Sequence, residues 1–195
     1  LFEDAMTSYG APAKRCTVCG NFCLHDEITD DQNPTCVVCG LPIVVVATNL
    51  ADGIDYGPYY FTGLDDAMYD LRTVHAGRRP TVKLLAATSS TYGYEWWKDS
   101  DDGIIIDLAG RDLTLHNNKA TGWVKIRNTS NTHAEVHGTV NVDRKYGTAT
   151  LTIPETDSDL TIDEVKIGTN GSAGLAGGSF GKISAEGEKT LASLP

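Results

Sequence analysis

The sequence predicts a mainly β fold in which short strands stack into a solenoid. Residues 103–116 (GIIIDLAGRDLTLH) carry the clearest pattern, because Ile104, Ile106 and Leu108 fall on alternate positions. Gly110 permits a bend, after which the alternation resumes. We therefore expect two short strands joined by a turn at this point, with no room for a helix.

The same alternation continues toward the C-terminal end of the chain. Further strands are expected at 81–86, 122–127, 134–142, 148–153 and 160–167, with turns at 128–131, 145–147, 154–159 and 168–174. Gly138 is expected to bend the longest strand. The spacing from one strand group to the next is about 20 to 25 residues, within the range of stacked repeats. A solenoid is the simplest arrangement that explains this spacing.

One amphipathic helix is predicted ahead of the coils, over residues 63–71. Thr62 and Asp65 fit a capping box. Its apolar residues at helical spacing are Leu64, Ala67, Met68 and Leu71. We expect this helix to cap the open end of the first coil. Residues 48–58, which contain Gly53, Gly57 and Pro58, are interpreted as a connection.

All five cysteines lie in a short segment before the helix. We divide the chain into a tail or linker at 1–14, a metal-binding module at 15–47 and the solenoid domain at 48–195. The module contains two Cys-x-x-Cys-Gly motifs, and its first predicted ligand set is Cys16, Cys19, Cys36 and Cys39. Glycine after each pair allows the tight turn that brings backbone N–H groups toward sulfur.

The spacing also allows an alternative ligand set. Cys23 and His25 could join Cys36 and Cys39 in a Cys₃His site, which would leave Cys16 and Cys19 for another partner. Disulfide pairing is the competing interpretation, but an odd number of cysteines argues against it. Sulfur-rich ligation favours zinc, and four protein ligands leave no open position, so the ion is expected to be structural.

Two resemblances add expectations of their own. The Cys-rich segment resembles the tandem zinc-ribbon repeats of surface proteins of Gram-positive bacteria. The motifs FTGLDDAMYDLRTVHAGRRPTVKLLA, IIIDLAGRDLTLHN and LAGGSFGKISAEGEKTLASL resemble right-handed parallel β-helix segments of the pectin-lyase-like kind, common in secreted and cell-surface proteins of Firmicutes. This resemblance implies a short right-handed parallel β-helix and an extracellular or cell-surface location in a bacterium.

Composition narrows the classes of partner. The formal net charge is −10, so the field of the whole molecule repels a phosphate backbone and nucleic acid is not expected as a partner. No apolar run approaches the roughly 20 residues that a membrane-spanning helix needs. The chain is expected to be a piece of a longer protein, with other domains of that protein among its partners.

Candidate ligand-binding and catalytic residues lie in the predicted solenoid. Tyr92, Tyr94, Trp96 and Trp97 could stack against sugar rings, although burial is the more common fate of large aromatic residues. Charged candidates for catalysis are Asp107, Asp112, Lys125, Arg127, Glu135, Asp143 and Arg144. The histidines His75, His116, His133 and His137 are scattered, lack the spacing of a metal site and are expected to be surface or turn residues.

These charged residues are more typical of a solvated outer face than of an active site. The expected function is therefore a non-catalytic module of an extracellular bacterial surface protein, acting as a stalk or as a surface that binds a glycan or a host. The alternative is a polysaccharide lyase or glycoside hydrolase that uses Asp107, Lys125 and Arg127.

Overall fold

The computed structural model describes residues 2–8, 10–30, 32–51, 54–73, 79–90, 95–96, 103–116, 119–155 and 159–186. Its strands are β1 (Phe2–Met6), β2 (Pro12–Cys16), β3 (Val45–Ala51), β4 (Ile54–Phe61), β5 (Arg79–Leu84), β6 (Thr88–Ser90), β7 (Glu95–Trp96), β8 (Ile104–Asp107), β9 (Leu113–Leu115), β10 (Lys119–Ala120), β11 (Trp123–Arg127), β12 (Ala134–Val142), β13 (Ala149–Ile153), β14 (Leu160–Ile167), β15 (Gly171–Leu175) and β16 (Ser179–Ala185). The helix of the described residues is α1 (Leu64–Thr73).

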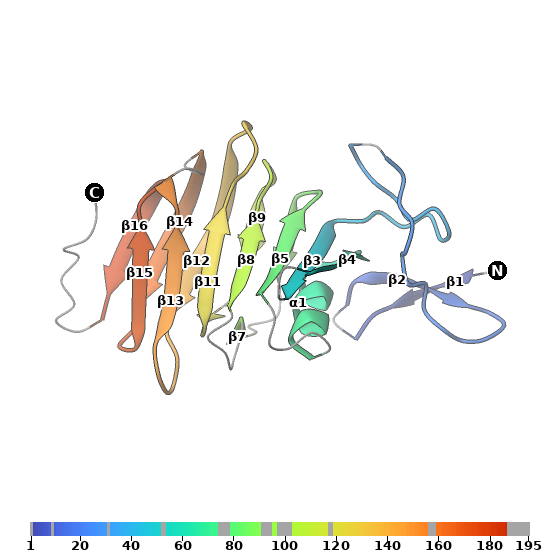
Figure 1. Cartoon of the computed structure of the whole chain (residues 1–195), viewed down its shortest axis with the longest axis horizontal. Coiled ribbons are helices and arrows are strands. Elements are labelled where there is room, and N and C mark those ends of the chain that lie inside the picture. Colours follow the sequence, from blue (N-terminus) through green and yellow to red (C-terminus); the bar gives the residue numbers. More distant parts are fainter. Residues whose placement is uncertain are drawn as a thin grey trace.

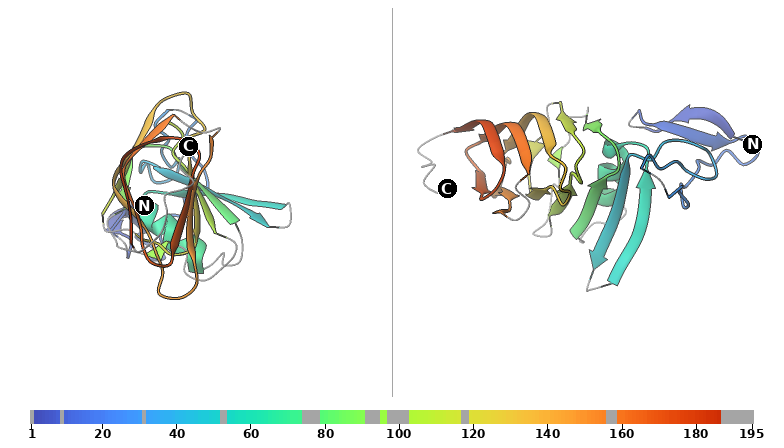
Figure 2. Two further views of the ribbon diagram at one scale, coloured as in Figure 1. Left: turned by 90° about the vertical axis from the view of Figure 1, so that its left-hand side faces the viewer. Right: turned by 90° about the horizontal axis from the view of Figure 1, so that it is seen from above.

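The strands form a β-solenoid, as the sequence predicted, and the solenoid has about three turns. One parallel ladder runs β15-β13-β11-β8-β5, and a second runs β16-β14-β12-β10-β7. Strand β9 pairs with β12, and β6 pairs with β9. Figure 1 shows the coils following one another along the long axis of the molecule, and the end-on view in Figure 2 shows the chain winding around a narrow interior. Parallel pairing of strands from successive coils is the feature that distinguishes this fold from a β-sandwich.

The interior is built from columns of aliphatic side chains, one from each coil. In the first ladder Ile104 pairs with Val124, and Val124 pairs with Leu151. All three side chains are fully buried. Burial of such a side chain contributes about 1.5–3 kcal/mol. Because inward positions alternate with outward ones, each column fixes the register of the strands around it.

Helix α1 lies at the end of the solenoid where the coils begin. Leu64, Ala67 and Leu71 are buried in the same apolar cluster as Val45 and Val82 of the first strands. The acidic residues Asp65 and Asp66 lie in its first turn, where negative charge interacts favourably with the helix dipole. The helix was predicted over 63–71, and its role as a cover for the first coil is consistent with this packing.

The coil turns are joined by a buried asparagine. The side-chain oxygen of Asn128 accepts hydrogen bonds from the N–H groups of Gly110 (2.8 Å) and Ser130 (3.2 Å). Its amide nitrogen donates to the carbonyls of Thr132 (2.8 Å) and Asp159 (2.6 Å). One side chain therefore holds together turns from three successive coils.

Three expectations about secondary structure were wrong. Residues 1–14 were read as an irregular tail, but β1 and β2 form an antiparallel pair there. Residues 48–58 were read as a connection, but β3 and β4 form an antiparallel hairpin that projects from the body in both views of Figure 2. Residues 168–174 were read as a turn, but β15 begins at Gly171 and pairs in parallel with β13.

Candidate metal centre

The structure gathers four of the predicted ligands into one group. Cys23, His25, Cys36 and Cys39 each offer one ligand atom, and these atoms all lie within 4.8 Å of one another. The Sγ atoms of Cys23 and Cys36 are 3.6 Å apart, and Cys39 Sγ is 3.5 Å from His25 Nδ1. Ligands that bind an ion tetrahedrally at about 2.0–2.3 Å stand about 3.5–3.8 Å from each other. The two measured distances fit a tetrahedral site, and the four residues together could hold one metal ion.

A tight turn positions two of these ligands. The Gly40 N–H donates to the Cys36 carbonyl (2.8 Å), and Gly40 has a φ of +73°. That left-handed conformation costs glycine little, which explains the glycine after the second cysteine. The turn points the thiols of Cys36 and Cys39 to the same side. Cys36 itself is buried, at 1% exposure, whereas Cys39 is half-buried.

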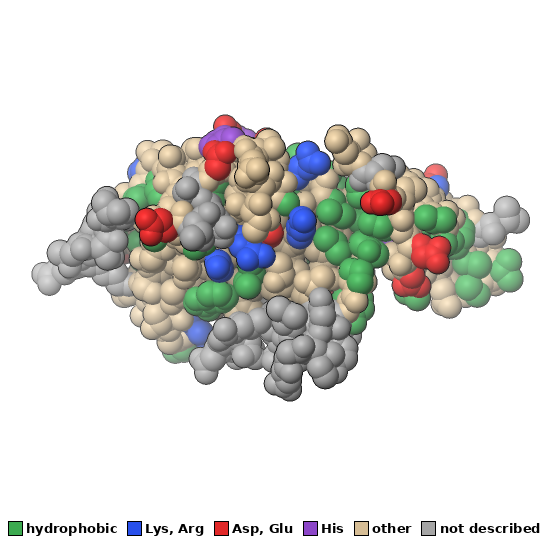
Figure 3. Space-filling view, turned by 45° about the horizontal axis from the view of Figure 1, so that its top comes forward, with side chains coloured by type: hydrophobic (Ala, Val, Ile, Leu, Met, Phe, Trp, Pro, Cys, Tyr) green, Lys and Arg blue, Asp and Glu red, His purple; other side chains and the backbone are tan. Residues whose placement is uncertain are grey.

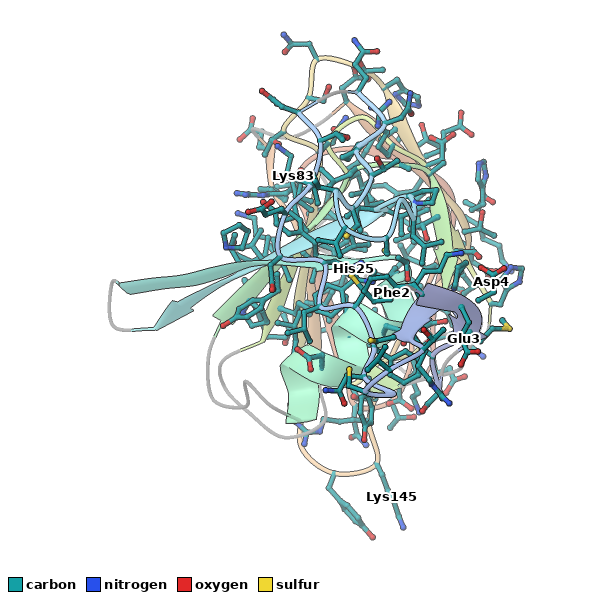
Figure 4. All side chains as sticks on the ribbon, turned by 90° about the vertical axis from the view of Figure 1, so that its right-hand side faces the viewer. Phe2, Glu3, Asp4, His25, Lys83 and Lys145 are labelled. Carbon is teal, nitrogen blue, oxygen red and sulfur yellow. The ribbon has the colours of Figure 1, made fainter. Side chains whose placement is uncertain are left out.

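The backbone bends sharply at the histidine. His25 has a φ of +56°, a conformation that residues other than glycine adopt rarely. In Figure 4, which views the molecule from the end with the Cys-rich segment, His25 lies toward the middle of that end and not at its rim. Burial lowers the pKa of His25 below its ordinary value, so its imidazole is neutral at pH 7. Neutral imidazole is the form that binds a metal ion.

The thiols of the group influence one another strongly. Burial raises the pKa of Cys23 to about 12, and the neighbouring Cys36 and Cys39 act in the same direction. Partial burial also raises the pKa of Cys36, but N–H groups of Cys39 and Val38 and the adjacent thiols outweigh it, so the net shift is downward. Cys36 therefore loses its proton first. A bound cation stabilises further thiolates in such a group.

Of the two ligand sets that the spacing allowed, the structure brings together the one with Cys23 and His25. Cys16 and Cys19 are not part of this group. They form their own tight turn, in which Cys16 is half-buried and Cys19 is exposed. The N–H groups of Cys19 and Val18 lower the pKa of the Cys16 thiol.

The donor set is suited to a soft or borderline metal ion. Three thiols and one imidazole match the ligands of structural metal sites in proteins, and four protein ligands complete a tetrahedron. Such a site has no position for a water molecule or a substrate. A metal ion in this arrangement could hold a loop segment together, but it would have no free position at which to activate water for hydrolysis.

Asp107 and Arg127, two of the charged candidates, stabilise turns of the solenoid. Asp107 is buried, at 3% exposure. Its Oδ1 accepts hydrogen bonds from the N–H groups of Ala109 and Thr129 (both 3.1 Å), and its Oδ2 accepts one from Thr129 Oγ1 (2.7 Å). Arg127 pairs with the same carboxylate. Both carboxylate oxygens are thus engaged by the protein.

The other charged candidates are spread over the outer face. The Asp112 carboxylate accepts the Glu135 N–H (3.0 Å), and Asp143 pairs with Lys119 (3.3 Å). Lys125 and Arg127 lie on the outward side of β11, whose buried positions alternate with them. Arg127 contacts Asp107 and shares its side of β11 with Lys125, and a separate contact joins Asp112 to the backbone of Glu135.

Two of the histidines lie at the surface, as expected, and contact carboxylates there. His133 Nδ1 is 2.7 Å from Asp159 Oδ1, and His137 Nε2 is 3.4 Å from Glu135 Oε2. Figure 3 shows imidazole and carboxylate side chains together at the upper edge of the solenoid. Alternate residues on a strand face the same side, so the sequence H-A-E-V-H within strand β12 and the residue before it could have indicated this cluster.

The predicted stacking residues are largely outside the described part of the chain. Tyr92, Tyr94 and Trp97 are not among the described residues, nor is His75. The backbone of Trp96 lies in β7, paired with Ala120 of β10. The stacking platform therefore stays a prediction.

Comparison of the chain with protein-family models, with curated proteins and with solved structures found no match. In the described residues, no helix has both the length and the apolar character needed to cross a bilayer.

Proposed function

We propose that this chain is a non-catalytic module of an extracellular bacterial surface protein, in which a solenoid serves as a spacer and a structural zinc centre holds a zinc-ribbon-like segment at one end. The observation that carries the proposal is that buried polar side chains of the solenoid form hydrogen bonds within the scaffold. Asp107 and Asn128 bond to backbone groups of neighbouring coils, which supports a role in holding the scaffold together. The extracellular bacterial location rests on the resemblance to cell-surface β-helix proteins.

Zinc is the metal that the donor set favours. Three thiolates with one imidazole are typical of structural zinc sites, and four protein ligands leave no coordination position for water. The loop that carries the ligands has little apolar core of its own: Val18, Leu24 and Val38 are all more than half exposed. Metal binding in such a segment supplies much of its folding free energy.

Elemental analysis of the purified chain tests the zinc assignment. We expect one zinc ion per chain, lost in Cys23→Ser and in His25→Ala and kept in Cys19→Ser. The Cys19 variant is a matched control, since it removes a thiol of the same segment outside the group. A chain without bound metal whose cysteines are oxidised would contradict the assignment.

An open groove supports a binding role alongside the spacer role. It has a volume of about 490 Å³ and lies between residues 28–34 of the Cys-rich segment and the coil turns. Lys83 and Arg111 line it, together with Asp30, Thr129 and Ser130. Two cations against one carboxylate leave this groove with a net positive charge in a chain of net charge −10, which favours an anionic ligand such as an acidic glycan of a host or cell surface.

A glycan array tests the binding role, and a lyase assay tests the enzymatic alternative. We expect acidic glycans to bind the chain and to bind Lys83→Ala/Arg111→Ala at least tenfold more weakly, with binding reduced by salt. Binding of the chain to uncharged glycans only would contradict the assignment of this groove as a site for acidic glycans. Release of unsaturated product from a uronate polymer, lost in Lys125→Ala/Arg127→Ala, would overturn the non-catalytic proposal.

A further inference from the structure

Two of the five cysteines lie outside the metal group. Cys23, Cys36 and Cys39 belong to that group, whereas Cys16 and Cys19 do not. All five are free cysteines in the structure. A pair of thiols is half of the donor set that a structural zinc ion needs. Two adjacent thiols can, however, carry out disulfide chemistry by themselves.

A tight turn holds Cys16 and Cys19 next to each other. The Gly20 N–H donates to the Cys16 carbonyl (2.9 Å), and Gly20 has a left-handed φ of +75°. In a turn of this size the Cα atoms of residues three apart are less than about 7 Å from each other, and a disulfide spans about 4.4–6.8 Å between Cα atoms. The side chains already meet, since the Cys16 and Cys19 thiols are hydrogen-bonded to each other. A bond between the two sulfur atoms therefore fits this turn.

The turn is also open to solvent. Cys19 is exposed, Cys16 is half-buried, and Val18 between them is 88% exposed. The N–H groups of Cys19 and Val18, together with the Cys19 thiol, lower the pKa of the Cys16 thiol. A lowered pKa increases the fraction of reactive thiolate at neutral pH. A dissolved oxidant can therefore reach this pair, and Cys16 can supply the thiolate.

The second Cys-x-x-Cys-Gly turn has the same form but different surroundings. Gly40 has a φ of +73°, and its N–H donates to the Cys36 carbonyl, as in the first turn. Cys36, however, is buried, and its sulfur lies 3.6 Å from that of Cys23. An ion bound to these thiolates would have to leave before their sulfur atoms could form a disulfide. The surroundings of the two turns thus favour metal binding at the second and oxidation at the first.

We propose that Cys16 and Cys19 are a redox-active dithiol, which a low-molecular-weight disulfide oxidises to an intrachain disulfide while the metal group keeps its three cysteines. The retention of those three cysteines rests on the metal-binding part of the proposed function. An odd total of cysteines is then compatible with a disulfide, because the five divide into three metal ligands and one redox pair.

The exchange has two steps. The Cys16 thiolate attacks one sulfur of the oxidant, which breaks its S–S bond, forms a mixed disulfide with Cys16 and releases the first thiolate. The Cys19 sulfur, having lost its proton, then attacks Cys16 Sγ, forms the bond between the two cysteines and releases the second thiolate. The protons of the two cysteines end on the two released thiolates. Two cysteine sulfurs are thus oxidised, and one disulfide is reduced to two thiols.

Oxidised glutathione is the probe that tests the proposal, applied to the zinc-loaded chain. Native mass spectrometry counts the zinc ions before and after oxidation. The reaction is then stopped with acid, free thiols are alkylated under denaturing conditions, and peptide mapping locates the alkylated and the oxidised cysteines. We expect the chain to lose two free thiols, those of Cys16 and Cys19, and to keep its zinc. Dithiothreitol should restore both thiols.

Single variants are the matched controls. Cys19→Ser should form no intrachain disulfide and should keep one glutathione on Cys16, and Cys16→Ser should also lack the disulfide. Free thiols at Cys16 and Cys19 after oxidation, or a second zinc ion bound by them, would overturn the inference. So would a disulfide that joins either of them to a cysteine of the metal group in the zinc-loaded chain. Failure of the zinc assignment is distinguishable, since the chain would then hold no ion before any oxidant is added.

Discussion

Arg127 and Asp107 face each other across two successive coils. They are register partners in the β8–β11 ladder, and Arg127 Nη2 lies 3.5 Å from Asp107 Oδ2. The side chain of Asp107 is 4% exposed and that of Arg127 is 29% exposed. Because the same carboxylate also accepts hydrogen bonds from Thr129, the pair ties a strand to the turn of the next coil. Two residues that resemble catalytic partners in the sequence thus stabilise the solenoid.

Asp107→Asn should destabilise the solenoid. The amide that replaces the carboxylate leaves fewer acceptors for the N–H groups of Ala109 and Thr129 and removes the charge that Arg127 faces. The expected loss in the free energy of unfolding is about 1–3 kcal/mol, measured by urea denaturation. Asp112→Asn is the control, since that exposed side chain has one backbone contact and should cost less than about 1 kcal/mol. Equal losses for both variants would argue against the buried network.

Gly138→Ala should distort the longest strand. Gly138 has a φ of +95°, and a Cβ there would lie 2.4 Å from the Leu115 carbonyl oxygen. The register of β12 against β14 shifts at this point, between Val136 and Thr139. We expect a loss of more than about 2 kcal/mol in thermal or urea unfolding. Gly174→Ala in β15 is the control, because a Cβ there meets nothing within 4 Å; a similar loss in both would contradict the steric explanation.

The regular coils could be predicted from sequence because the alternation of Ile104, Ile106 and their successors reflects which side chains are buried. Gly171–Leu175 could not, because its strand contains two glycines and owes its conformation to pairing with β13. The β3–β4 hairpin was obscured by Gly57 and Pro58, which are usual turn residues. The strand conformation of these segments is determined by pairing with other strands and not by local propensity.

The choice between the two sets of metal ligands could not be made from the sequence either. Spacing identifies two Cys-x-x-Cys-Gly turns, but the turns are locally equivalent, so spacing alone cannot say which donors meet. The choice depends on how the chain between Cys23 and Cys36 folds back, with Ile28 paired against Cys36. That pairing is tertiary information, and it places Cys23 and His25 beside the second turn.

Acid should weaken the contact between Asp143 and its neighbours. Burial raises the pKa of Asp143, but the Asn170 N–H and Lys119 outweigh it, so the pKa lies below its ordinary value. A carboxyl with a lowered folded-state pKa contributes stability above its unfolded pKa and loses it as pH falls through the folded value. Asp143→Asn should therefore reduce the fall in melting temperature from about pH 4 downward.

Lys119→Met should reduce the same acid dependence, since it removes one source of the shift, a cation 3.3 Å from the carboxylate. Melting curves across that pH range, recorded for both variants and the original chain, provide the measurement. An unchanged slope in Asp143→Asn would show that the pH dependence arises at other carboxyl groups.

Removing the metal should loosen the Cys-rich segment and leave the coils folded. The segment has little apolar core, whereas the solenoid interior is continuous from Val45 to Leu175. With a chelator present, limited proteolysis should cut between residues 16 and 40 at least tenfold faster, while far-ultraviolet circular dichroism changes little. Unfolding of the whole chain on chelation would contradict this separation.

X-ray absorption of the zinc-loaded chain tests most directly the claim that Cys23, His25, Cys36 and Cys39 hold one ion. We expect three sulfur ligands at about 2.3 Å and one nitrogen ligand at about 2.0 Å, with one ion per chain. A shell of four sulfur atoms without nitrogen, retained in His25→Ala, would contradict it and would assign the ion to the four cysteines of the two turns.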